Sequence, residues 1–212
     1  MGKALENGKF QQTGFLQPPP RPVMTALSSL KSDPHLPQTP LQGYIEEITA
    51  CRKEYRYPGQ EHDRLFLSYY EHNLEHATCD SCNATHVSKR PSRSDQHPRI
   101  HYGLIASGNQ VMRNAKLRDN WSMERDVLCF EMEAAGVMNT LPCLVIRGIC
   151  DYSDSHKNKR FQEYAAATAA SYAKLLLSYM KDSSDLDAAA FRSIKEDQGL
   201  LGVFRRALSF TG

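Results

Sequence analysis

Residues 103–109 read GLIASGN, residues 130–135 read FEMEAA, and residues 145–151 read VIRGICD. Each stretch belongs to an apolar segment typical of a buried strand, and each ends in small, polar or acidic residues. Strands that alternate with helices along a chain indicate an α/β layer fold. We therefore predict an α/β three-layer sandwich with a central mixed sheet, which is incomplete because only three good strands are visible.

The apolar pattern places these elements within the chain. We predict strands at residues 100–107, 127–130 and 143–149, and helices at residues 114–121, 134–139 and 161–180. Two earlier helices are predicted, one from Pro22 and one over residues 41–53. The expected organisation is a loop and helices of the partial domain (1–54), an irregular insertion (55–99), the C-terminal half of the core (100–181) and a tail or linker (182–212).

Composition excludes several classes of protein. The net charge of +2 over 212 residues gives no reason to expect nucleic acid as a partner. No apolar run approaches the ~20 residues of a membrane-spanning helix, and the N-terminus lacks the apolar core of a secretory signal. The six cysteines are irregularly spaced and do not form a secreted disulfide framework. A cytoplasmic location without membrane contact is the prediction.

Two carboxylates are the candidates for chemistry. Glu133 follows a predicted strand end, where a carboxylate can accept two hydrogen bonds from a ribose diol and stabilise positive charge on the sugar. Asp151 follows a buried strand, at the edge where open α/β sheets bind ligands. When protonated, it can give a proton to a purine N7 as the base leaves. Met132 would offer an apolar surface beneath the nucleoside.

Simpler explanations exist for the same residues. Glu131 and Glu133 can be first-turn helix acids favoured by the helix dipole. Asp151 can be a loop or turn residue. Arg147, within an apolar strand pattern, is expected to form a structural ion pair rather than to bind phosphate. The occurrence of three motifs in this order favours a site over these separate explanations.

The three stretches together resemble the C-terminal half of the nucleoside phosphorylase and nucleosidase superfamily, and look closest to its fungal branch. The resemblance implies that Glu133 holds the ribose, Asp151 protonates the base and Met132 lies under the nucleoside, with Glu131 beside them. It also implies that Ser107, Gly108, Asn109 and Val111 form the base-binding strand end. The family often has an acid at the Asn109 position and an aromatic residue at the Val111 position, so the chain departs from it there.

The resemblance sets further expectations for activity and partners. It implies cleavage of a purine N-glycosidic bond, no cofactor, and inorganic phosphate as a candidate co-substrate. Nothing before Ile100 resembles the superfamily's phosphate-binding glycine loop, so the chain is expected to begin midway through the fold and to be weak or inactive alone. A homo-oligomer and fused signalling modules are further expected partners. The alternative function is a nucleoside-sensing or effector module of a multidomain, immune-like receptor.

The predicted insertion carries a second pattern. Cys79 and Cys82 are separated by two residues, a spacing that allows two thiolates to share a tetrahedral zinc. His72, His76 and His86 lie nearby as further candidate ligands. The competing explanation is a reduced pair in an exposed loop. In either case residues 72–86 are expected to be exposed and peripheral to the sheet.

Overall fold

The computed structural model describes residues 2–4, 10–12, 17–33, 38–76, 78–138 and 140–180. Its elements are β1 (Gly2–Ala4), β2 (Phe10–Gln12), α1 (Arg21–Ser32), α2 (Gln38–Cys51), β3 (Leu104–Ser107), α3 (Ala115–Arg125), β4 (Val127–Glu131), α4 (Ala134–Met138) and α5 (Gln162–Met180). The 3-10 helices are η1 (Lys53–Tyr55), η2 (Gln60–His62), η3 (Cys79–Ser81) and η4 (Ala84–His86). The predicted tail, 182–212, lies outside the described residues.

All five predicted helices are present, with ends that differ by a few residues. Their local chemistry is clear for α1 and α3. Pro22 occupies the first turn of α1, where a backbone N–H has no helical partner to lose. The Asn114 side chain accepts a hydrogen bond from the N–H of Leu117 at 3.0 Å and so caps α3. That helix ends at Asp126, which is in the left-handed conformation with φ 55°.

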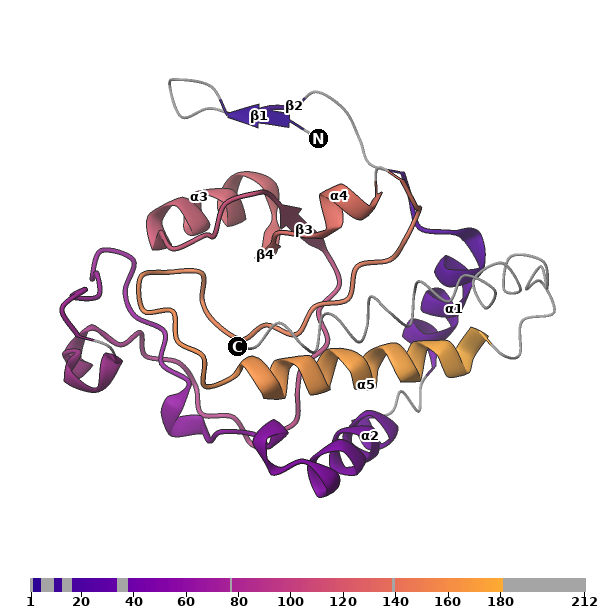
Figure 1. The fold of residues 1–212 in the computed structure, drawn as a ribbon, viewed down its shortest axis with the longest axis horizontal. Coiled ribbons are helices and arrows are strands. Elements are labelled where there is room, and N and C mark those ends of the chain that lie inside the picture. The colour runs from indigo at the N-terminus through magenta and orange to yellow at the C-terminus, as the bar shows by residue number, and fades with distance from the viewer. Residues whose placement is uncertain are drawn as a thin grey trace.

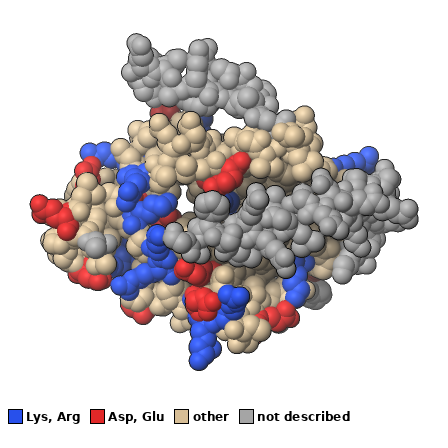
Figure 2. Space-filling model, in the orientation of Figure 1, with Lys and Arg blue, Asp and Glu red and all other residues tan. Residues whose placement is uncertain are grey.

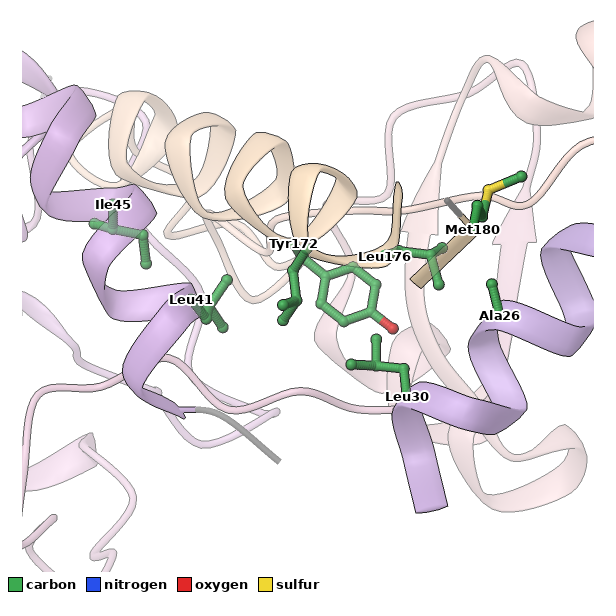
Figure 3. Packing of buried hydrophobic residues seen from close by; sticks show 8 residues of the cluster. Ala26, Leu30, Leu41, Ile45, Tyr172, Leu176 and Met180 are labelled. Atoms are coloured by element: carbon green, nitrogen blue, oxygen red, sulfur yellow. The ribbon is translucent and has the colours of Figure 1, made fainter. Parts of the chain in front are cut away.

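The main core is helical. The long helix α5 packs against both α1 and α2, and in Figure 1 β3, β4, α3 and α4 lie together on the side of α5 opposite α2. Figure 3 shows the side chains that meet between the three helices. The buried cluster consists of Ala26, Leu30, Leu41, Ile45, Tyr172, Leu175, Leu176 and Met180. Helices that lie far apart in the sequence thus share one apolar interface. Burial of apolar surface is the dominant favourable contribution to the free energy of folding.

The described strands form two small sheets. Strands β3 and β4 pair in parallel, with Ala106 opposite Phe130 and Ser107 opposite Glu131. A parallel pair needs a crossover connection, which α3 supplies. Strands β1 and β2 form a separate antiparallel pair. The molecule is therefore compatible with a partial α/β fold, in which the carboxyl ends of β3 and β4 bring Ser107 and Glu131 side by side.

The prediction of a third strand at residues 143–149 is wrong. This segment has no ladder partner among the described residues and instead runs across α5. Its Leu144 and Ile146 pack against the helical core. A Cβ on Gly148 would lie 1.9 Å from the carbonyl oxygen of Ala165, so the segment meets the backbone of α5 closely. A helix can bury an apolar run as well as neighbouring strands can. The composition of residues 143–149 therefore did not determine whether they pair with a strand. A three-layer sandwich is accordingly not confirmed.

The segment between α2 and β3 has little regular structure, apart from its short 3-10 helices and one bridge between Phe66 and Val87. It nevertheless has a buried centre. The ring of Phe66 stacks on that of His156 with centroids 4.0 Å apart, and Tyr70 stacks on His86 at 4.3 Å. The prediction that residues 72–86 are exposed is therefore wrong for Cys79, which is buried in this centre.

Candidate functional site

A cavity of about 610 Å³ lies between the irregular segment, residues 144–154 and α5. This volume is in the usual range for small-molecule sites. The cavity wall contains Asp151, together with the half-buried Cys129 of β4. Basic residues also contribute, and Figure 2 shows Lys and Arg side chains gathered on one face of the molecule. The arginines that line the cavity are Arg64, Arg90, Arg93, Arg99 and Arg147.

Asp151 is held firmly in the cavity wall. Its side chain is 8% exposed, and the ammonium of Lys157 lies 2.8 Å from Oδ2. The N–H of Ser153 donates to Oδ1 at 2.9 Å, and the thiol of Cys150 donates to Oδ2 at 3.4 Å. The carboxyl group is thus oriented by three neighbours and kept largely from bulk water. It has the fixed position that a proton donor needs, and its catalytic role stays a prediction.

Glu133 does not line this cavity, whereas Asp151 does. Its side chain is 69% exposed, and its Oε2 lies 3.3 Å from Nη1 of Arg147. Arg147 does line the cavity. The predicted ion pair of Arg147 is therefore present, and its partner is the predicted ribose ligand. Arg147 thus connects Glu133 to the cavity wall, and the action of Glu133 and Asp151 on one substrate stays a prediction.

Glu131 is buried and caps α4. Its Oε2 accepts hydrogen bonds from the N–H groups of Glu133 at 2.9 Å and Ala134 at 2.8 Å. Ser107 accepts from the N–H of Ala135 at 2.9 Å, so both residues satisfy the start of the helix. Burial alone would raise the pKa of Glu131, but the hydrogen bonds from Ser107, Ala134 and Glu133 hold that pKa below its ordinary value.

The other predicted substrate ligands lie near this cap. The N–H of Gly108 donates to the carbonyl of Glu131 at 3.1 Å, which continues the strand pairing by one residue. Asn109 and Val111 follow in exposed positions. Met132 is also exposed, and its N–H donates to Oε2 of Glu133 at 3.2 Å. These residues form an open rim beside the end of β3 and β4, and none of them lines the cavity.

The sequence did not single out the aromatic wall of the cavity. Tyr57 contacts Phe161 and Tyr164 edge-on, with ring centroids 5.9 Å and 5.2 Å apart. All three residues line the cavity. Burial raises the pKa values of Tyr57 and Tyr164, so both phenols stay protonated and neutral near pH 7. The only sequence signal was the YPGQ stretch at residues 57–60, which carries no chemistry of its own.

A polar network also escaped the sequence analysis. Tyr152 donates to Oδ1 of Asp63, and Arg90 donates to the Tyr152 hydroxyl at 2.6 Å and to Oδ1 of Asp63 at 3.1 Å. Burial and the Asp63 carboxylate raise the pKa of Tyr152 to about 12. Arg118 of α3 donates to the carbonyl of Tyr152 at 2.8 Å. The loop that carries Asp151 is thereby tied to the irregular segment and to α3.

The predicted metal ligands separate into two groups. His72, Cys79 and Cys82 come together, with one ligand atom of each lying within 4.8 Å of the others. His76 approaches this cluster only through its backbone carbonyl, and the His86 ring stacks on Tyr70 instead. The spacing of histidines in a loop does not determine which rings turn inward, so this division required the structure. Burial raises the pKa of the Cys79 thiol to about 11.

Over part of its length the chain is similar to proteins of the nucleoside phosphorylase and nucleosidase class. The 5'-methylthioadenosine/S-adenosylhomocysteine nucleosidase of Mycobacterium bovis is 31% identical over 124 residues, which cover 56% of this chain and 47% of that protein. ATP nucleosidase Cap17 of Escherichia coli is 38% identical over 72 residues, or 31% of this chain and 14% of that protein. Both of these relatives are nucleosidases by name.

A third similarity is longer. A nucleotide-binding leucine-rich repeat (NLR)-like protein of Hyaloscypha variabilis is 43% identical over 179 residues, which cover 84% of this chain and 17% of that protein. The chain thus spans about half of the mycobacterial nucleosidase and a small part of the NLR-like protein. No protein-family model matches the chain. No solved structure matches it either. Among the described helices, none is long and apolar enough to cross a membrane.

Proposed function

We propose that the chain carries the base-binding part of a site that cleaves the N-glycosidic bond of purine nucleosides. The observation that carries this proposal is the position of Asp151, a shielded carboxyl group in the wall of a ligand-sized cavity that the rings of Tyr57, Phe161 and Tyr164 also line. Aromatic faces can stack on a purine, and a carboxylic acid can hydrogen-bond to N7. A complete three-layer sandwich would need strands in addition to β3 and β4.

In the proposed reaction the bond between C1' of the ribose and N9 of the purine breaks, and its electron pair moves onto the base. Protonated Asp151 gives its proton to N7, which neutralises the leaving base. An oxygen of phosphate then bonds to C1', or an oxygen of water does so and releases a proton, which restores protonated Asp151. Asp151 is the acid in this scheme, and Lys157 and Ser153 position it through the contacts at 2.8 and 2.9 Å.

Glu133 is proposed to receive the ribose hydroxyls and to stabilise the positive charge that develops on the sugar. Its exposed carboxylate has an oxygen available beyond the pair with Arg147. Arg147 would orient this carboxylate at the edge of the cavity. Met132, Ser107, Gly108, Asn109 and Val111 would form the rim, and Glu131 would support it by fixing the start of α4.

The arginines of the cavity support an anionic group near the reacting bond. Arg64 and Arg90 come from the irregular segment and Arg147 from the stretch across α5, so cationic groups face the cavity from separate parts of the chain. Guanidinium groups bind phosphate through paired hydrogen bonds. Two groups are candidates for this anion: inorganic phosphate as a co-substrate, and a phosphate group of the substrate itself. The names of the two nucleosidases share an adenosine group, which favours an adenine nucleoside or nucleotide.

The first prediction concerns Asp151 and Glu133. In a longer natural protein that contains this chain, Asp151→Asn should lower the rate of base release from adenosine, inosine or ATP by ~10²–10⁴-fold, because the transferable proton is lost. Glu133→Gln should weaken transition-state binding. Chromatography of the released base gives the rate, and ribose versus ribose 1-phosphate as second product distinguishes water from phosphate.

The exposed acids Asp126 and Glu124 provide matched controls. Asp126→Asn and Glu124→Gln make the same chemical changes outside the cavity and should leave the rate unchanged. A robust rate that survives both Asp151→Asn and Glu133→Gln would show that the assigned chemistry is wrong.

The second candidate function is a nucleoside-sensing or effector module. The similarity to an NLR-like protein favours it, because the chain matches a small part of a much longer protein. Calorimetric binding of an adenine nucleoside without release of base would favour this function over catalysis. A cytoplasmic location, a homo-oligomer and attached signalling modules are the corresponding proposals.

A further inference from the structure

Three soft ligands meet in the irregular segment, away from the proposed acid. The Nδ1 atom of His72 lies 3.3 Å from Sγ of Cys82 and 3.7 Å from Sγ of Cys79. A tetrahedral zinc, with bonds of about 2.3 Å to sulfur and about 2.0 Å to nitrogen, separates its sulfur and nitrogen ligands by about 3.5 Å. The observed separations therefore match the edges of such a site.

The imidazole of His72 has the tautomer that a metal requires. Its Nε2 lies 2.8 Å from the backbone carbonyl oxygen of His76. A carbonyl oxygen only accepts hydrogen bonds, so Nε2 carries the proton and Nδ1 presents a lone pair toward the two sulfurs. A hydrogen bond from the second ring nitrogen to a carbonyl is the usual way in which proteins orient a metal-binding histidine.

The backbone brings the two cysteines to one side. Cys79 begins η3, and the N–H of Cys82 donates to the carbonyl of Cys79 at 3.1 Å, which closes a tight turn between them. The N-cap Thr78 accepts a hydrogen bond from the N–H of Asp80 and holds the start of this turn. The two thiols are thus placed by local structure, and His72 is added from seven residues before the turn.

Two arrangements compete for this cluster. In the first, both cysteines are thiols: Cys79 donates to the carbonyl oxygen of His156 at 3.6 Å, and Cys82 donates to Nδ1 of His72 at 3.3 Å. In the second, both sulfurs and Nδ1 are ligands of one metal ion, which the separations of 3.3 and 3.7 Å fit. A divalent cation satisfies the nitrogen and both sulfurs together. We propose that His72, Cys79 and Cys82 bind one zinc ion, with the fourth position for water.

The position of the cluster gives the ion a structural role. The N–H of His72 donates to Oγ of Ser155 at 2.9 Å, and Sγ of Cys79 lies 3.6 Å from the carbonyl oxygen of His156. Both partners belong to the loop that begins with Asp151. Cys79 also lines a second cavity of about 550 Å³, which provides a path for the ion. Zinc would therefore fasten the irregular segment to the loop that carries the proposed acid.

The test begins with metal content. The 212-residue chain, produced with zinc present and freed of loosely bound metal, should contain one zinc ion per chain by elemental analysis. Cys82→Ser and His72→Gln should each lower the affinity for zinc by at least about tenfold. Cys51→Ser and His76→Gln are the matched controls, because Cys51 is exposed on α2 and His76 contributes only its backbone. Both controls should keep the full zinc content.

A second measurement uses the unmodified chain, so it does not depend on whether a variant folds. Removal of zinc with a chelator should make two additional thiols react with a thiol reagent, and added zinc should protect them again. Cobalt in place of zinc should give the absorption of a tetrahedral thiolate complex. Wild-type chain without zinc after reconstitution, an unchanged number of reactive thiols, or equal zinc loss in His76→Gln and His72→Gln would overturn the proposal.

Discussion

At the scale of single residues, Glu131 and Glu133 show how two nearby acids acquire different environments. Glu131 is 6% exposed and accepts two backbone hydrogen bonds at the start of α4, whereas Glu133 is turned outward toward Arg147. Residues i and i+2 of a strand share a face, so it is the end of β4 at Glu131 and the turn into α4 that give the two acids different directions. Of the two acids, Glu131 is therefore the one that caps the helix.

The second prediction concerns the pH dependence of this cap. Because hydrogen bonds lower the pKa of Glu131 in the folded chain, its stabilisation is present above the pKa of the unfolded chain and is lost as pH falls through the folded value. Glu131→Gln should therefore reduce the free energy of unfolding at pH 7 by about 1 kcal/mol. Urea unfolding at several pH values should show the difference from wild type shrinking below about pH 4. A difference that stays constant or grows on acidification would contradict the assignment.

At the scale of elements, residues 143–149 can lie across α5 because Gly148 has no side chain. A Cβ on Gly148 would meet three backbone atoms of Ala165, the closest at 1.9 Å, and a backbone cannot turn aside as a flexible side chain can. This contact explains how residues 143–149 cover a helix although they form no strand. The same contact also determines where the chain enters the loop that begins with Asp151, because Asp151 lies only three residues further along the chain.

The third prediction follows from this contact. Gly148→Ala should lower the free energy of unfolding by about 1–3 kcal/mol, because the segment and α5 must move apart. Gly43→Ala is the matched control, since Gly43 lies within α2 and an added Cβ has nothing within 4 Å. This control should stabilise the chain by up to about 1 kcal/mol through helix propensity. Equal effects of the two substitutions in thermal or urea unfolding would show that the close approach is not maintained in solution.

At the scale of the whole molecule, α1, α2 and α5 share one core, and the network around Tyr152 ties the irregular segment and α3 to the loop that carries Asp151. Neighbouring leucines on α5 allow this organisation to be tested. Leu176 is 3% exposed within the cluster, whereas Leu177 is 50% exposed. Their side chains are identical, so any difference between them reports position alone.

The fourth prediction is that Leu176→Ala lowers the free energy of unfolding by about 2–5 kcal/mol, through lost burial and a residual cavity. Leu177→Ala should change it by less than about 0.5 kcal/mol. Urea unfolding followed by circular dichroism measures both. A small effect of Leu176→Ala would contradict a single core shared by the three helices.

The sequence by itself determined the helices, the strand ends and the two motifs that end in Glu133 and Asp151. These are local features, because helical periodicity, proline and asparagine at helix starts and polar residues after apolar runs are set by near neighbours in the chain. It also singled out the cysteine pair, whose spacing alone permits two thiols to meet. The similarity to nucleosidases agrees with the resemblance drawn from these motifs.

Only the tertiary structure decided where each of these features faces. It gave residues 143–149 a helix instead of strand neighbours, and it turned His72 rather than His76 or His86 toward the thiols. It also assembled the cavity from Tyr57, Arg90 and Tyr164, which lie far apart along the chain. Burial and side-chain direction depend on contacts between distant segments. A local sequence pattern does not specify which distant segment will cover it.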